Sequence, residues 1–260
     1  IIQVNGVLIN RSGSTLSNNG TLTVTGNITN DAARAFNAGT LEFKGTAAQT
    51  LSGLADFNAK NVLINNAAGV TLNTTLKADG LVTFTNGIIT AAASTTPMVF
   101  TTNATVTGTA DASHVNGYVV KEGTGAFTYP VGDGTKYQKV DVNPSANGSG
   151  IQVKYNAADA GAGTFTAGGT EATQLVSYNT NEYWDITPLS TATGTVIVYW
   201  DGYKDAFSNT VSQRKVAHKT GGNWLNEGST ATGTTAAGSV TSNAINTWSP
   251  FAMGSISSVL

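Results

Sequence analysis

The chain has 260 residues and a net charge of −2, and only 11% of its residues are charged, against about 25% in a typical soluble domain. Its 13 lysines and arginines are scattered, which argues against a nucleic-acid-binding protein because such proteins need clustered cations. No apolar run approaches the roughly 18 residues of a membrane-spanning helix. The absence of cysteine excludes disulfides, zinc–thiolate sites and cysteine nucleophiles. With 40% apolar residues in short runs, the composition indicates an ordered, β-rich, extracellular type of chain.

Residues 1 to about 110 carry a repeat with a period of about twenty residues. Within the segments TLTV, TLEF, NVLI, LVTF and MVFT, successive strand centres are apolar: Val24, Phe43, Ile64, Phe84 and Phe100. A repeat of this length is too short for a pair of helices and suits one coil of a parallel β-helix. We predict at least four stacked parallel coils over residues 20–105, with the first four of these side chains pointing inward.

A second set of repeated positions is Phe36, Phe57 and Leu76. Because stacked coils lie about 4.8 Å apart, we expect these three side chains to form an interior apolar ladder. The neighbouring Asn37 and Asn58 would then form either an amide ladder or solvated turns, and we favour solvated turns.

From about residue 112 the period disappears, and short alternating strands separated by turn signals replace it. Strand-like segments lie at 118–121, 126–129, 138–142, 151–155, 182–186, 195–200 and 214–218. Many short strands with frequent turns argue for an antiparallel β-sandwich. The predicted fold is therefore all-β, with a parallel β-helix of about 20-residue coils over residues 1–111 and a sandwich module over 112–260.

The end coils of a β-helix expose unpaired strand edges, which must be capped or continued. We expect the short segment Thr109–His114 to join the two modules end to end in a stiff rod, so that the second module covers one edge. At the other edge the chain opens directly in the strand-like sequence IIQV. We expect this end to continue into upstream sequence or a neighbouring coil, in a processed or excised part of a longer protein.

Residue types that catalyse reactions occur without their usual context. His114 and His218 are the only histidines, and neither lies near a Gly-x-Ser-x-Gly motif, so we interpret both as surface residues. Glu182 and Asp185 flank a Tyr-Trp pair, which faintly resembles a sugar site with two carboxylates. In a strand these two positions point to opposite faces, so we expect the acids to cover strand edges.

Lyase and calcium sites also lack support. The charged residues of the repeat half do not stack in register with one another; they are Asp31, Asp56, Asp79, Asp111, Lys44, Lys60 and Lys77. Calcium takes about six to eight oxygens, and the segments Asp201–Asp205 and Gly132–Gly134 are too sparse in carboxylates. We therefore predict no catalytic residues, no metal site and no cofactor.

Four aromatic residues are the candidates for ligand binding: Tyr199, Trp200, Tyr203 and Trp224. They could form a platform on which a carbohydrate stacks, or they could belong to the buried core of the sandwich. We favour the core, because tryptophan is highly buried on average.

Four segments carry a resemblance to a known family. They are VNGYVVK with GTGAFTYPVG between residues 115 and 132, EYWDI at 182–186, YWDG at 199–202 and WSPFAMGS at 248–255. Together they resemble the adhesin-like surface proteins of Bacteroidota-type bacteria that are exported by type IX secretion. The resemblance covers about residues 112–256, and the repeat half is similar only in style.

The resemblance implies a non-enzymatic structural protein at the outer cell surface or outside the cell, a β-rich stalk for attachment or display. In that family a C-terminal sorting domain follows the SPFxxGS strand, where this chain stops at Leu260. The implied partner is the type IX secretion machinery, with surface polysaccharide or other copies of the chain as further expected partners. Two alternatives stay open: a carbohydrate-binding module of a larger secreted protein, and a polysaccharide-active β-helix enzyme.

Overall fold

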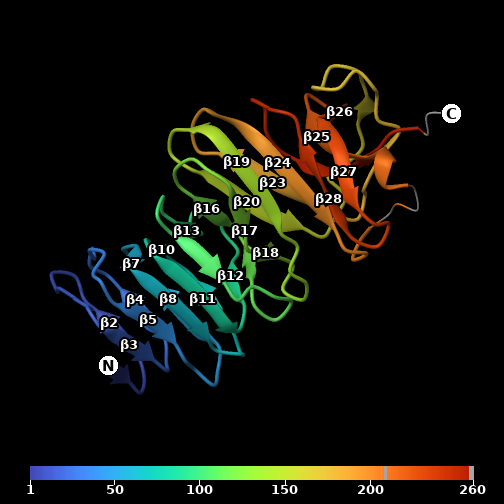
Figure 1. The fold of residues 1–260 in the computed structure, drawn as a ribbon. Coiled ribbons are helices and arrows are strands. Elements are labelled where there is room, and N and C mark those ends of the chain that lie inside the picture. The colour runs from blue at the N-terminus through green and yellow to red at the C-terminus, as the bar shows by residue number, and fades with distance from the viewer. Residues whose placement is uncertain (206, 208–209, 258–260) are drawn as a thin grey trace. The chain divides into compact units, whose positions relative to one another are not determined.

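The computed structural model describes residues 1–205, 207 and 210–257, and these form an almost purely β structure (Figure 1). The described part contains a single short helix, the 3-10 turn η1 (Val211–Gln213). The chain divides into two compact units, one of residues 1–122 and 130–137 and the other of residues 123–129 and 138–260.

The first unit is a β-solenoid of about six turns, in which strands of successive turns pair in parallel. One sheet contains β1 (Ile2–Val4), β3 (Thr21–Val24), β5 (Thr40–Phe43), β8 (Asn61–Asn65), β11 (Leu81–Asn86) and β14 (Thr105–Thr107). A second contains β2 (Leu8–Asn10), β4 (Ile28–Asn30), β6 (Gln49–Ser52), β9 (Val70–Leu72), β12 (Ile89–Ala91), β15 (Val115–Gly117) and β18 (Val131–Gly132). A third row contains β7 (Phe57–Ala59), β10 (Leu76–Ala78), β13 (Met98–Phe100) and β16 (Val119–Lys121).

Apolar ladders fill the interior of the solenoid. Val24 pairs with Phe43, Phe43 with Ile64, and Ile64 with Phe84, and all four are at most 3% exposed. This confirms the predicted parallel coils and their inward-pointing residues. Partners in the three rows are 16 to 26 positions apart in the chain, because the turns between strands differ in length.

The predicted stacking of Phe36 on Phe57 is wrong. Phe36 lies outside any strand and is 37% exposed, whereas Phe57 pairs with Leu76. The Arg34 guanidinium covers the Phe57 ring instead, 4.5 Å from its centroid, and Arg34 Nη1 donates to the Asn58 carbonyl at 2.7 Å. The longer turn before β5 shifts the chain, so a cation replaces the expected aromatic ring at this level of the stack.

Buried amides accompany the apolar ladders at positions that the sequence did not single out. Asn10 Nδ2 donates to Asn30 Oδ1 at 2.7 Å, and Asn66 Nδ2 donates to Gln49 Oε1 at 3.0 Å. All four residues are at most 4% exposed. Asn58, which we interpreted as a solvated turn residue, lies in β7 and donates through Nδ2 to the Arg34 carbonyl at 2.6 Å. Amides of neighbouring coils thus pair with one another or with a backbone carbonyl.

The solenoid continues past residue 111. Strands β15 and β16 pair in parallel with β12 and β13, and β18 pairs with β15. His114 is fully buried in this coil, with Nδ1 3.2 Å from the Ala110 carbonyl oxygen, and its Nε2 accepts a hydrogen bond from the Gly134 amide at 3.1 Å. The expected division after residue 111 therefore falls within a coil, and His114 is not a surface residue.

The second unit contains two mainly antiparallel sets of strands. One is β17 (Phe127–Tyr129), β19 (Val140–Asn147), β24 (Ala192–Trp200), β28 (Gly238–Ser242) and β27 (Gly228–Gly233). The other is β20 (Ile151–Asn156), β23 (Tyr183–Pro188), β29 (Phe251–Ser255), β25 (Arg214–Thr220) and β26 (Asn223–Asn226), with β21 (Thr164–Phe165) beside β26 and β22 (Ser177–Tyr178) beside β29. Inward-facing residues such as Trp184, Val196 and Phe251 are fully buried. Alternate residues of β20 and β24 are buried, as expected for strands with one covered face.

Candidate functional site

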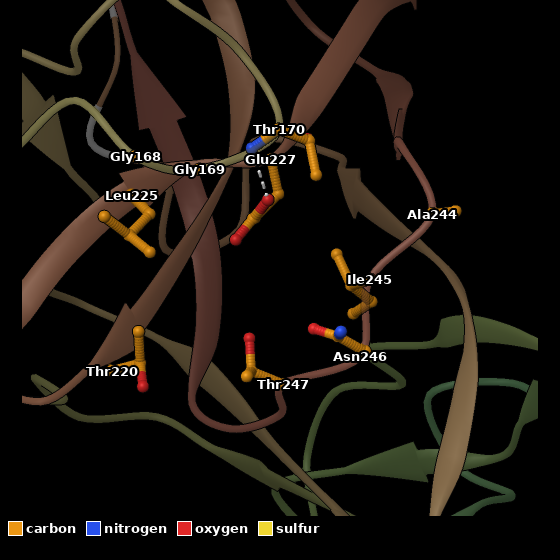
Figure 2. Close-up of a pocket in the computed structure, with 10 residues that line it drawn as sticks. All are labelled: Gly168, Gly169, Thr170, Thr220, Leu225, Glu227, Ala244, Ile245, Asn246 and Thr247. Atoms are coloured by element: carbon orange, nitrogen blue, oxygen red, sulfur yellow. Dashed lines mark hydrogen bonds between the residues drawn. The ribbon is translucent and has the colours of Figure 1, made fainter.

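The second unit has an open pocket of about 360 Å³ beside Glu227, a volume in the range of about 300–1,000 Å³ that is typical of small-molecule sites. Figure 2 shows its lining: Gly168, Gly169, Thr170, Thr220, Leu225, Glu227, Ala244, Ile245, Asn246 and Thr247. Thr220 and Leu225 come from the β25–β26 hairpin, and Glu227 lies between β26 and β27. The other residues come from two loops, one between β21 and β22 and the other between β28 and β29.

Hydrogen bonds fix both loops against the strands. The first loop is held by the Glu171 amide, which donates to the Asn226 carbonyl at 3.2 Å, and by Asn226 Nδ2, which donates to the Thr173 carbonyl at 2.8 Å. In the second loop, Ile245 exchanges backbone hydrogen bonds of 2.8 and 3.1 Å with Gly194 of β24. The walls of the pocket are therefore positioned before any ligand arrives.

Gly169 brings the first loop close to the β25–β26 hairpin. A Cβ at this position would collide with the backbone of Asn226. Glycine therefore allows the loop to lie close enough for the next residue, Thr170, to donate its backbone N–H to Glu227 Oε2 at 2.9 Å.

Glu227 is a buried carboxylate at the wall of the pocket, with 3% of its surface exposed. Its Oε1 lies 3.1 Å from Nδ1 of His218, which is fully buried. Burial raises the pKa of Glu227, but the hydrogen bonds from His218 and Thr170 lower it by more, so the pKa lies below its usual value. Glu227 is therefore ionised at neutral pH.

The prediction of a surface position for His218 is wrong. Its ring stacks on Phe251 at a centroid distance of 4.5 Å, and its Nε2 is buried without a hydrogen-bond partner among the described atoms. The pair of His218 and Glu227 resembles the two inner members of a catalytic triad. A triad would also require a hydroxyl bonded to Nε2, and the described part of the chain places none there.

Three further polar side chains line the pocket without a hydrogen bond inside the described structure: Thr220, Asn246 and Thr247. Asn246 and Thr247 are exposed, and in Figure 2 the Asn246 amide and the Thr247 hydroxyl face the space below Glu227. Leu225 and Ile245 add apolar surface. The pocket thus combines one carboxylate, the three hydroxyls of Thr170, Thr220 and Thr247, an amide and the aliphatic side chains of Leu225 and Ile245.

The structure does not assemble the four aromatic candidates into a platform. Trp200 and Trp224 are 3% and 0% exposed and lie in different sheets. Trp200 packs against the Arg214 guanidinium and Trp224 against the Tyr178 ring, at centroid distances of 4.5 and 4.2 Å. Both tryptophans are therefore core residues, with no face open for a sugar to stack on.

The two tyrosine candidates are half-buried and already have cationic neighbours. The Lys139 ammonium lies 4.2 Å from the Tyr199 ring, and the Lys204 ammonium lies 5.4 Å from the Tyr203 ring. Tyr199 also donates its hydroxyl to Asp141 at 2.8 Å.

Glu182 lies directly before β23 and Asp185 lies within it, and the two have separate environments. Asp185 accepts hydrogen bonds from Asn156 and Ser249. Glu182 is 1% exposed rather than at a strand edge, and it accepts hydrogen bonds from the Tyr155 hydroxyl at 2.8 Å and from Asn179 at 3.1 Å. The pKa of Glu182 is raised to about 8, mainly by burial and with contributions from the nearby charges of Asp201 and Asp205.

The remaining charged candidates serve turns and ion pairs. Asp133 accepts three hydrogen bonds of 2.8 Å from its own turn. Lys60 Nζ lies 2.7 Å from Asp79 Oδ2 in the next coil, so these two charges do meet, contrary to the expectation that none stack. Throughout residues 1–205, 207 and 210–257, no group of three or more His, Cys, Asp or Glu side chains could hold a metal ion.

The sequence analysis did not select the residues of the Glu227 pocket. The Asn-Glu-Gly segment around Glu227 and the Ala-Ile-Asn-Thr segment at 244–247 look like ordinary turns. The proximity of the second segment to the SPFAMGS motif is the sole signal in the sequence that could have directed attention to it.

Comparison with protein-family models, with curated proteins and with solved structures gave no match for this chain. Among the described residues, no helix has the length and apolar character needed to cross a membrane.

Proposed function

We propose that this chain is a non-enzymatic, adhesin-like structural protein, a β-rich stalk for attachment or display outside the cell or at its outer surface. The proposal includes a coil length of about twenty residues for the solenoid and a β-sandwich for the second unit. Export through the type IX secretion machinery, by way of an adjoining sorting domain, rests on the resemblance of residues 112–256 alone.

The observation that carries the proposal is the outward row of uncharged polar residues along the second sheet of the solenoid. Thr50 pairs with Thr71, Thr71 with Thr90, and Thr90 with Asn116, and all four are half-buried on the outer side of strands whose alternate residues are buried. Parallel pairing places such neighbours about 4.8 Å apart. A regular row of hydroxyl and amide groups suits hydrogen bonding to polysaccharide or to another copy of the chain, without long-range charge attraction.

Adhesion of the purified chain to polysaccharide-coated and cell surfaces, measured from low to moderate salt, tests this proposal. We expect binding that changes little with salt and that survives replacement of His114, Glu182 or Asp185 by Ala in variants that remain folded. A steep loss of binding with salt would contradict it, because charge attraction is screened over about 10 Å at 0.1 M salt. Sugar release abolished by one of these substitutions would favour the polysaccharide-active enzyme.

A carbohydrate-binding module is the second candidate, and the pocket beside Glu227 favours it. The pocket offers a buried carboxylate together with neutral donors and acceptors. A glycan array would separate the two functions, since a module should select particular glycans while a stalk should not.

A further inference from the structure

The Glu227 pocket has the features of a preformed site for one kind of ligand. Its carboxylate is buried and fixed by hydrogen bonds from His218 and from the amide and hydroxyl of Thr170. Both loops that complete it are tied to strands. The polar side chains of Asn246 and Thr247 face the same space and have no hydrogen bond within the described structure (Figure 2).

We propose that this pocket binds a neutral saccharide unit, with Glu227 accepting a hydrogen bond from a ring hydroxyl and with Asn246, Thr247 and Thr220 completing the polar contacts. The proposal deepens the carbohydrate-binding alternative. It does not depend on a role in surface attachment.

The acceptor capacity of Glu227 leaves room for a sugar hydroxyl. A carboxylate has about four lone-pair sites on its two oxygens, and Glu227 receives hydrogen bonds from His218, from the Thr170 amide and from the Thr170 hydroxyl. About one acceptor site therefore remains, and a sugar hydroxyl can donate to it. Hydrogen bonds to an ionised acceptor are about twice as strong as neutral ones.

The other polar groups distinguish a polyol from a cation. The hydroxyls of Thr220 and Thr247 and the amide of Asn246 both donate and accept hydrogen bonds, as sugar hydroxyls do, whereas an ammonium group only donates. Leu225 and Ile245 supply an apolar wall for the C–H groups of a ring. A uronate should bind poorly, because its charge would face the ionised Glu227 in a partly desolvated site.

The test uses the whole chain and a panel of monosaccharides: glucose, galactose, mannose, N-acetylglucosamine, glucosamine and glucuronate. Saturation-transfer NMR detects binding, and titration gives the Kd. We expect saturable binding of at least one neutral sugar and weaker binding of glucuronate. Asn246→Ala and Thr247→Val should each weaken that binding at least about fivefold, the effect of one net hydrogen bond.

Matched controls separate binding from folding. Thr232→Val changes an exposed threonine of β27 outside the pocket and should leave the Kd unchanged. Asn246 and Thr247 are exposed, so their variants should have the melting temperature of the wild type. Glu227→Gln keeps an acceptor for the Thr170 amide, and it should weaken sugar binding more than Asn246→Ala or Thr247→Val does.

Three results would overturn the assignment. The first is no saturable binding of any neutral sugar up to about 50 mM, well above the roughly millimolar Kd of a weak ligand. The second is wild-type affinity in both Asn246→Ala and Thr247→Val, and the third is binding of glucosamine alone, which would indicate a cation site. Loss of surface adhesion with sugar binding intact would instead refute the stalk proposal and leave this one standing.

Discussion

Glu182 gives the second unit a stability that depends on pH in an unusual direction. Most paired carboxylates favour the charged form, but burial raises the pKa of Glu182 from 4.5 to about 8. Below about pH 8 the folded state therefore holds a proton on this side chain, whereas the unfolded chain releases it above pH 4.5. Between these values the folded state binds the extra proton, so the free energy of unfolding should fall as pH rises.

The size of the effect follows from the shift. One pKa unit corresponds to about 1.4 kcal/mol, so a shift from 4.5 to about 8 implies a loss on the order of 4–5 kcal/mol across this range. Glu182 is 1% exposed, so solvent screening does little to reduce it. Such a loss is a large part of the roughly 5–15 kcal/mol that stabilises a typical domain.

Urea denaturation followed by tryptophan fluorescence isolates the second unit, because all four tryptophans lie between residues 138 and 260. We expect the wild-type midpoint to fall between pH 5 and 8 and then to level off. Glu182→Gln should remove most of this slope and stabilise the unit at pH 8, since a glutamine can accept from Asn179 and donate to Tyr155. A control, Glu171→Gln, should keep the wild-type slope. A flat wild-type profile, or an unchanged slope in Glu182→Gln, would refute the reasoning.

Four further predictions concern the solenoid and the whole chain. Phe43→Ala should destabilise the solenoid by about 3–5 kcal/mol through the cavity it leaves, measured by circular dichroism during denaturation; a loss under 1 kcal/mol would contradict its core position. Burial lowers the pKa of His114 from 6.5, so the free energy of unfolding should fall as the pH drops below 6.5. His114→Gln should flatten this dependence of the free energy of unfolding on pH, and an unchanged dependence would show that His114 does not cause it. Lys60→Ala removes a half-exposed ion pair and should cost at most about 1 kcal/mol; a larger loss would show that the pair is more desolvated than its exposure indicates. Excess EDTA should leave the melting temperature unchanged, and a fall of more than about 10 °C would reveal a tightly bound structural ion, because a site occupied at 100-fold excess contributes about 2.7 kcal/mol.

Repetition made the parallel coils predictable from the sequence. Val24, Phe43, Ile64 and Phe84 recur at nearly constant spacing, and stacking equivalent strands is how such a repeat buries them all. This inference succeeded because it depends on local periodicity, which each segment of the chain carries by itself.

The sequence by itself determined that the chain is all-β, that its first part stacks in parallel coils and which apolar residues fill them. Only the tertiary structure decided that Arg34 rather than Phe36 covers Phe57, because turn lengths vary and shift the register. It also decided which residues form the Glu227 pocket, where Thr170 and Glu227 are hydrogen-bonded although they lie 57 positions apart in the chain. Contacts between distant loops depend on how whole sheets pack, and no local pattern of residue types records that geometry.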